Sequence, residues 1–371
     1  MAVSKTRRIT TPGFSGLICS SLLLVAAAPA SADSQHEFLL FPSADTFNTF
    51  GESDPAVEDS SVRGSLDVLY SFSTDRFRFL AEYLLSTEES ELERLKVGWA
   101  WRDEVMLWFG RTHISSKHWT SEYHHGQYLQ TSITRPSLEE WEDESGPIPS
   151  HVTGVSLDVR HSLHDDASIN YVIGVGLAPK FVGQELMPFD MLDPESGHDL
   201  SVHFKLSYRP RQFENMQLGL ISSWNDIGVE SESSPALADL RQIEQLTYGA
   251  FADWQWRKLR LIASFVRFDM DLEYFDETVK DDFDLAYLQL EYPVSDSVTL
   301  FGRTDNGFGE DWSAYLRLLP AFVSHRHMLG LRWDFADRHA LTMEIADTAQ
   351  QAVVTDHEYF KEVRLQWSAV F

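Results

Sequence analysis

The sequence predicts an all-β fold, a transmembrane antiparallel up-and-down β-barrel of about 16 strands, with roughly 14 to 18 as the range. Three features support this: an N-terminal segment typical of export, alternating segments along the whole chain, and a last strand that ends on an aromatic residue. Only alternate residues of a barrel strand face lipid, so such a chain needs no long apolar run. No apolar run of about 18 residues follows the N-terminal segment, so we expect no membrane-spanning helix.

The N-terminal segment has the order of a secretory signal. Three basic residues precede a largely apolar stretch (14–28), and small residues follow it up to Ala32. This predicts a Sec-type signal peptide over 1–32 and an outer-membrane barrel over 33–371. A single membrane anchor is the alternative, which the short apolar stretch disfavours. The lone cysteine, Cys19, lies inside the signal, so we expect no disulfide in the mature chain.

The strands are expected where apolar and polar residues alternate. Between Leu200 and Tyr208 every even position is apolar or aromatic, and the odd positions are Ser, His, Lys and Ser. Successive side chains of a strand point to opposite faces, so this pattern predicts one oily and one polar face. The predicted strands are 36–41, 63–73, 77–86, 92–101, 104–111, 151–160, 168–177, 200–208, 216–224, 243–254, 259–268, 283–292, 297–305, 326–335, 339–346 and 360–371.

The connections between these strands alternate between short and long, as periplasmic turns and extracellular loops do. The long ones hold 35 of the 57 acidic residues but only six basic residues. A solvated loop is the plain interpretation of each acidic run. Together they predict a negative outer mouth that favours cations and lipopolysaccharide bridged by divalent cations. The predicted long connections are 42–62, 87–91, 112–150, 178–199, 225–242, 269–282, 306–325 and 347–359.

The last strand places Trp367 and Phe371 on its apolar face. It resembles the C-terminal strand of bacterial outer-membrane barrels, in which the terminal Phe takes part in recognition by the barrel-assembly machinery. The resemblance implies that these two residues belong to an assembly signal and that this machinery is a partner.

The longest connection, 112–150, carries a second resemblance. The stretch Gly110-Arg111-Thr112-His113, then Trp119, Tyr123-His124-His125-Gly126 and Arg135-Pro136, is similar to a block in porin-like outer-membrane proteins of proteobacteria that mostly lack an assigned function. That family often has Pro-Leu-Gly between the first His and the Trp, where this chain has residues 114–118 instead. The resemblance implies a porin-type barrel in a Gram-negative outer membrane and says little about the solute.

In trimeric general porins the third loop folds into the lumen, and by analogy we expect 112–150 to narrow the channel here. A homotrimer is therefore a candidate assembly, and no nucleic-acid partner is expected. Four histidines of the loop invite a metal hypothesis, but their spacing matches no known site, so no metal or cofactor is assigned. Wall arginines could line the pore or form lumen ion pairs. The candidate pore residues are Arg111, His113, His118, Trp119, Tyr123, His124, His125, Glu139, Glu140, Arg303, Arg332 and Arg364.

The function expected from these features is that of a porin, a passive channel for small hydrophilic solutes or ions. Sixteen strands leave an aqueous lumen. A structural or adhesive barrel without transport is one alternative, and a barrel-borne hydrolase is another. The sequence contains neither a Gly-x-Ser-x-Gly elbow nor a His-Glu-x-x-His motif, so no catalytic residue and no enzymatic activity is assigned.

Overall fold

The structure is a computed structural model. It describes residues 34–51, 60–87, 90–123, 126–142, 145–163, 167–192, 194, 197–210, 216–310, 313–319, 321–351 and 357–371. The predicted signal peptide and two candidate pore residues, His124 and His125, lie outside the described residues.

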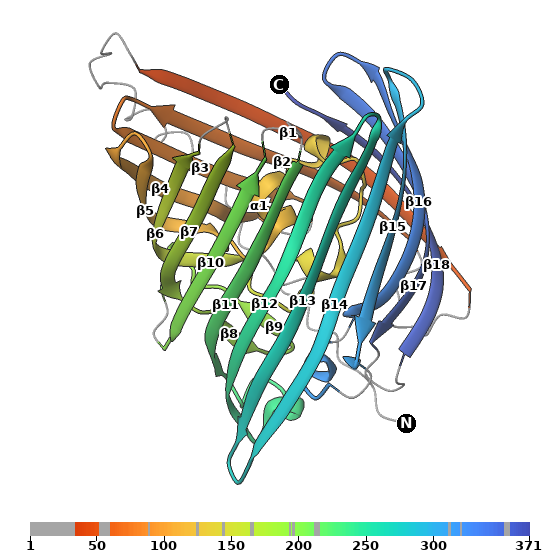
Figure 1. Cartoon of the computed structure of the whole chain (residues 1–371). Coiled ribbons are helices and arrows are strands. Elements are labelled where there is room, and N and C mark those ends of the chain that lie inside the picture. The colour runs from red at the N-terminus through yellow and green to blue at the C-terminus, as the bar shows by residue number, and fades with distance from the viewer. Residues whose placement is uncertain are drawn as a thin grey trace, which may run out of the picture.

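Sixteen strands form one closed antiparallel barrel (Figure 1). Each barrel strand pairs with the next one along the chain, and β1 pairs with β18 to close the ring, with Ser43 opposite Ser368. The prediction of a sixteen-stranded up-and-down barrel is confirmed, and each predicted strand overlaps one of these. The barrel strands are β1 (Gln35–Phe50), β2 (Ser60–Ser73), β3 (Phe77–Ser86), β4 (Ser90–Arg102), β5 (Val105–His113), β6 (His151–Ser162), β7 (Ser168–Leu177), β10 (Leu200–Arg209), β11 (Met216–Val229), β12 (Leu240–Trp256), β13 (Leu259–Tyr274), β14 (Thr278–Pro293), β15 (Val298–Phe308), β16 (Val323–Ala336), β17 (His339–Gln351) and β18 (His357–Ala369).

The wall alternates as a membrane barrel requires. In β10, Leu200 and Tyr208 are exposed on the outer surface, whereas Ser201, His203 and Lys205 are buried on the inner one. Apolar side chains therefore face the lipid and polar side chains face the lumen.

Several predicted long connections are shorter than predicted, because strands extend into them. β11 continues to Val229 and β12 begins at Leu240, inside the predicted connection 225–242. Likewise β13 runs to Tyr274 and β14 begins at Thr278, inside 269–282. Beyond the bilayer a strand can present acidic residues to water on its outer face, so acidic composition does not end the hydrogen-bonded ladder.

The apolar face inverts along β13. Phe265 faces outward and is 48% exposed, but Phe268 and Leu272 face inward and are fully buried. Asp269 and Asp271 take the outward positions between them. Charged side chains on the lipid-facing wall are costly at membrane depth. This inversion therefore indicates that the barrel leaves the lipid near Phe268.

Beyond that boundary the barrel interior holds a large cluster of apolar side chains. The connection between β7 and β10 forms a hairpin, β8 (Lys180–Val182) and β9 (Glu185–Met187), and β8 pairs in parallel with the end of β11. Two 3-10 turns, η4 (Pro235–Leu237) and η6 (Leu316–Leu318), pack beside it. We call the result the mouth cluster. Its members include Phe181, Leu186, Ile227, Leu237, Leu240, Ile243, Phe268, Met270, Leu272, Phe283, Tyr315, Leu316 and Leu319.

The remaining described helices are single turns in the connection between β5 and β6: α1 (His118–Tyr123), η1 (Gln127–Leu129) and η2 (Ser137–Glu139). Within the described ranges, none of the helices combines the length and the apolar character that crossing a membrane requires.

The ends of the barrel are joined by main-chain hydrogen bonds. The Phe371 N–H donates to the Leu40 carbonyl oxygen at 3.0 Å, and the Leu40 N–H donates to the Phe371 carbonyl oxygen at 3.0 Å. His339 stacks on Trp367 and meets Phe371 edge to face. The predicted assembly residues therefore lie at the seam between the first and last strands.

Candidate functional site

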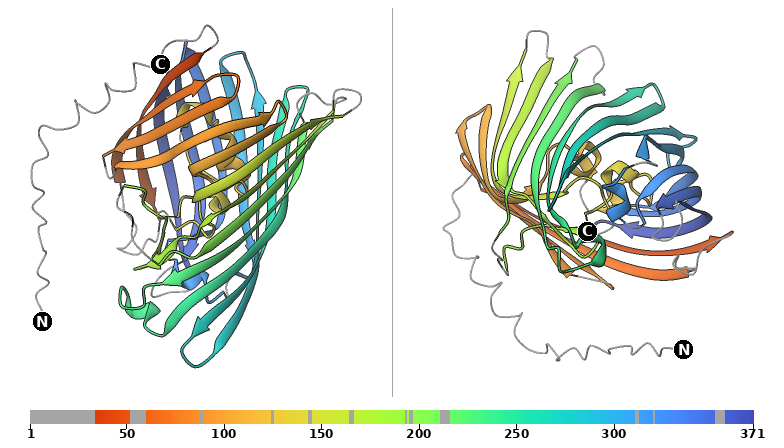
Figure 2. Two further views of the ribbon diagram at one scale, coloured as in Figure 1. Left: turned by 90° about the vertical axis from the view of Figure 1, so that its left-hand side faces the viewer. Right: turned by 90° about the horizontal axis from the view of Figure 1, so that it is seen from below.

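The segment 114–150, which we call the lumen loop, lies inside the barrel. It leaves β5 at His113 and enters β6 at His151, and these two residues are directly opposite each other in the β5–β6 ladder. Figure 2 shows its helical turns enclosed by the ring of strands when the barrel is seen from below. Most of its described side chains are buried, which an excursion into solvent would not produce.

Three arginines of the wall hold the lumen loop by its main chain, and we call them the arginine clamp. Arg303 donates to the carbonyl oxygens of Thr134 at 2.8 Å and Arg135 at 2.7 Å. Arg326 also donates to the Arg135 carbonyl, at 3.1 Å. Arg332 donates to the carbonyls of Tyr128, at 2.7 Å, and Gln130.

Glu344 of β17 completes this attachment from the acceptor side. Its carboxylate accepts hydrogen bonds from the backbone N–H groups of Ile133 and Thr134. Buried main-chain groups must find partners, and here charged wall side chains supply both donors and acceptors. The loop is therefore fixed against β15, β16 and β17.

The opposite side of the lumen loop packs on β10, β12 and β14. The His118 ring stacks on Phe251 with centroids 3.9 Å apart, and Trp119 meets Tyr287 edge to face. Lys205 donates to the hydroxyl of Ser121 at 2.7 Å. Burial holds the pKa of His118 well below its ordinary value, so this imidazole is neutral at physiological pH.

Lys117 ties the start of the lumen loop to its end. Its Nζ donates to the hydroxyl of Ser150 at 2.6 Å and to the Glu140 carbonyl oxygen. Burial lowers the pKa of Lys117 to about 8, and burial also raises the pKa of Glu139 in the same loop. The loop thus has internal polar ties in addition to the clamp.

A cavity of about 340 Å³, which we call the vestibule, opens beside the lumen loop. Its lining carries more acids than bases, with Glu91, Glu93, Glu142, Glu185 and Asp190 against one arginine. That residue, Arg111, is ion-paired with Glu91 and donates to the Phe189 carbonyl at 2.9 Å. Gly110 directly precedes it with φ of 122°, and a Cβ there would lie 2.1 Å from the Leu95 carbonyl oxygen. Only glycine allows this approach of β5 to β4.

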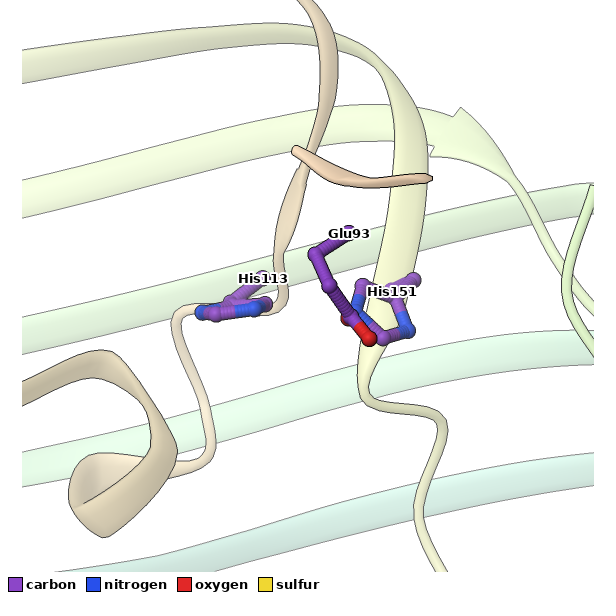
Figure 3. Close-up of side chains that lie close together, drawn as sticks. All are labelled: Glu93, His113 and His151. Carbon is purple, nitrogen blue, oxygen red and sulfur yellow. The ribbon is translucent and has the colours of Figure 1, made fainter. Parts of the chain in front are cut away.

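Three side chains gather beside the vestibule, which two of them, Glu93 and His151, line; the third is His113 (Figure 3). The Glu93 carboxylate is directed at the His151 ring, with 2.8 Å between Oε2 and Nε2. Trp141 stacks on His151, with centroids 5.4 Å apart and ring planes 10° from parallel. On its other nitrogen, His151 Nδ1 meets Glu142 Oε1 at 2.8 Å. Burial disfavours the charged Glu142 carboxylate, but the positive charge of the protonated His151 ring outweighs this and holds the pKa of Glu142 at about 2.

The structure distributes the candidate pore residues over several environments. Most belong to the lumen loop or contact it: His118, Trp119, Tyr123, Glu139 and Glu140 in the loop, and Arg303 and Arg332 on the wall. Arg111 and His113 adjoin the vestibule and its three-residue cluster. Arg364 pairs with Glu362 at 3.0 Å, next to the Phe47 ring. Of the four histidines in the predicted connection 112–150, the structure describes His113 and His118. These two lie apart: the His113 ring packs near His151, and the His118 ring stacks on Phe251.

Four residues of this site were missed by the sequence interpretation. Glu344 lies between apolar Met343 and Ile345, and Arg326 has the same parity as the inward Arg332 on its predicted strand, so parity could have identified both. Glu93 could not be found this way, because a bulge opposite Glu82 and Tyr83 turns it inward. His151 stands at the first position of its strand, where periodicity is not yet defined.

A closed sixteen-stranded barrel with a polar inner wall and an inward-folded loop defines the class: the fold is that of a porin-like β-barrel. No protein-family model matches the sequence, and no curated protein matches it.

Solved structures do match the fold. The outer membrane channel DcaP of Acinetobacter baumannii has a TM-score of 0.60 at 9% identity, covering 93% of this chain and 99% of that one. An anion-selective porin from Comamonas acidovorans has a TM-score of 0.62 at 13% identity, covering 91% and 100%. Salmonella typhi OmpF, in a complex with daunomycin, has a TM-score of 0.61 at 10% identity, covering 91% and 98%. At these identities the likeness concerns the fold alone.

Proposed function

We propose that this protein is an outer-membrane porin, a passive channel for small hydrophilic solutes or ions. In this proposal the lumen loop sets the aperture. One observation carries the proposal: the arginine clamp and Glu344 hold the loop within the lumen from β15, β16 and β17, while α1 packs on β12. A loop fixed in this way narrows the lumen permanently but need not block it. A sieve for small solutes requires such a narrow passage.

Planar-bilayer recording of the purified protein tests the proposal. We expect discrete conductance steps, and larger or noisier steps when residues 127–140 are replaced by a short Gly-Ser linker. A barrel variant with an exterior substitution, Arg267→Met on β13, is the matched control and should conduct like the wild type. Well-folded protein that inserts without any conductance step would contradict the porin function.

We further propose that the channel prefers cations, because the vestibule lining is mainly acidic. A low-dielectric wall lined by one sign of charge concentrates the opposite ion. The reversal potential in a tenfold KCl gradient should therefore indicate K⁺ over Cl⁻, and Glu185→Gln with Asp190→Asn should reduce that preference. An unchanged reversal potential in the double variant would show that the vestibule does not set selectivity.

A structural or adhesive barrel remains the second candidate, and the mouth cluster favours it. Phe181, Tyr315 and their neighbours fill the outer end of the barrel beside β11 to β14 with apolar side chains. A barrel sealed by such a plug would have a structural or adhesive role and would transport no solute. The conductance experiment separates the two functions directly.

We also propose that the outer surface of the long strands contacts lipopolysaccharide through divalent cations in the outer membrane. Asp271 and Glu273 of β13 and Asp282 of β14 face outward beyond the inferred membrane boundary. Removing divalent cations with EDTA should weaken lipopolysaccharide retention by the purified protein. With divalent cations present, Asp271→Asn with Asp282→Asn should weaken it as well, and EDTA should then have less effect on this variant.

A further inference from the structure

The cluster of Glu93, His113 and His151 has the composition of a metal site. Its three ligand atoms, one from each side chain, all lie within 4.8 Å of one another, and all three residues are buried. They come from three successive strands, β4, β5 and β6, and the histidines are cross-strand partners. Rigid, hydrogen-bonded strands therefore hold the donors near one point.

The histidine side of the cluster is already oriented for a ligand role. Glu142 Oε1 lies 2.8 Å from His151 Nδ1, which places the other nitrogen, Nε2, toward Glu93. Metal-binding histidines nearly always donate their second ring N–H to a carboxylate or carbonyl, because this fixes the tautomer and raises ligand basicity. Trp141 stacked on the His151 ring further restricts its rotation.

An ion-pair network without metal is the simpler interpretation, since His151 bridges two glutamates. It accounts for the Glu142–His151–Glu93 chain. His113 approaches the same point from the neighbouring strand, with its ring centroid 5.1 Å from that of His151, and adds a second imidazole to the cluster. Two imidazoles and one carboxylate form a donor set that suits Zn²⁺ and neighbouring divalent transition metals.

A cation also has a path to this point. Glu93 and His151 line the vestibule of about 340 Å³, together with Glu91, Glu185 and Asp190. The one arginine of that lining, Arg111, is neutralised locally by its ion pair with Glu91. The cavity leaves room for a water molecule as a fourth ligand, as open zinc sites have.

We propose that Glu93, His113 and His151 form a binding site for a divalent transition metal of the zinc type. Glu142 is its orienting carboxylate. Because His113 ends β5 and His151 begins β6, the bound ion joins the two ends of the lumen loop to β4. Metal binding at this site does not depend on transport, so its test is independent of the test of the porin function.

Isothermal titration of the untagged, metal-free protein in detergent with Zn²⁺ tests the site. We expect one saturable site in the wild type, with affinity weakened at least about tenfold in Glu93→Gln and in His113→Gln. Glu142→Gln should weaken it by about 10- to 100-fold, the usual effect of losing an orienting carboxylate. His203→Gln is the matched control, because this buried histidine faces the lumen outside the cluster and should leave Zn²⁺ affinity unchanged.

Heat-modifiable migration in SDS gels verifies that each variant is folded. Absorption spectra with Co²⁺ provide a second readout, and the visible bands of the wild-type complex should disappear in His113→Gln. The proposal is overturned if the wild type binds no Zn²⁺, or if the folded Glu93→Gln and His113→Gln variants bind as tightly as the wild type.

Discussion

Replacing Arg303 with methionine should release the lumen loop from the wall. The Arg303 side chain is fully buried and joins Asp305, at 3.1 Å, to the loop carbonyls of Thr134 and Arg135. Methionine keeps the apolar stem but removes every one of these donors. Asp305, whose side chain is also fully buried, then remains as an uncompensated charge.

The size of the effect follows from this burial. Removing one partner of a buried ion pair typically costs about 3–5 kcal/mol. Since about 1.4 kcal/mol corresponds to a factor of ten, the loop should open at least about 100-fold more often than in the wild type. The double variant Arg303→Met with Asp305→Leu should recover part of this loss, because replacing both partners removes the stranded charge.

Hydrogen exchange of the folded protein in detergent is the suitable assay. The backbone N–H groups of Ile133 and Thr134 are bonded to Glu344, so their exchange reports detachment of the loop. Arg267→Met is the control, since Arg267 lies on the outer face and pairs with Asp282 and Asp284, away from the loop. If Arg303→Met folds normally and these amides exchange within about threefold of the wild-type rate, the clamp does not hold the loop.

Three further predictions concern stability and assembly. Because burial lowers the pKa of Lys117 to about 8, below its ordinary value of 10.5, the unfolded chain binds more protons between these values. The free energy of unfolding in guanidinium should therefore rise from about pH 8 to about pH 10.5, and Lys117→Met should reduce this rise; an identical rise in the variant would exclude Lys117 as a source of it. Trp119→Ala should lower the free energy of unfolding by about 3–5 kcal/mol, since Trp119 is fully buried against Tyr123 and Tyr287, and a loss below about 1 kcal/mol would contradict this packing. Phe371→Ser should slow assembly in cells but not refolding in detergent, measured by the heat-modifiable fraction; equal slowing in both would indicate a seam defect and not a lost assembly signal.

The strand number could be predicted because the bilayer imposes a strict rule on the wall. Every lipid-facing position must be apolar, so alternation such as that from Leu200 to Tyr208 marks each crossing. The rule ends where the membrane ends. Residues 269–274 alternate equally well, but with the acidic face outward, and the acidic composition favoured a loop over the strand that the structure contains.

The candidate site was predictable only in outline. The position and length of the connection 112–150 indicated an inward loop, and Arg303 and Arg332 followed from parity. The contacts between Glu344 and the loop backbone join residues more than 200 positions apart, which no local pattern encodes. Glu93 faces inward because of a strand bulge, and neither the composition nor the periodicity of the sequence predicts this bulge.

The arginine clamp has a consequence for how this protein can change over evolutionary time. Arg303, Arg326 and Arg332 all donate to carbonyl oxygens, which every amino acid provides, in addition to their bonds with the side chains of Thr134 and Glu140. Substitutions of other loop side chains can therefore change the lining of the lumen while the carbonyl bonds keep the loop attached. The loop can in this way vary one residue at a time without first rebuilding the wall that holds it.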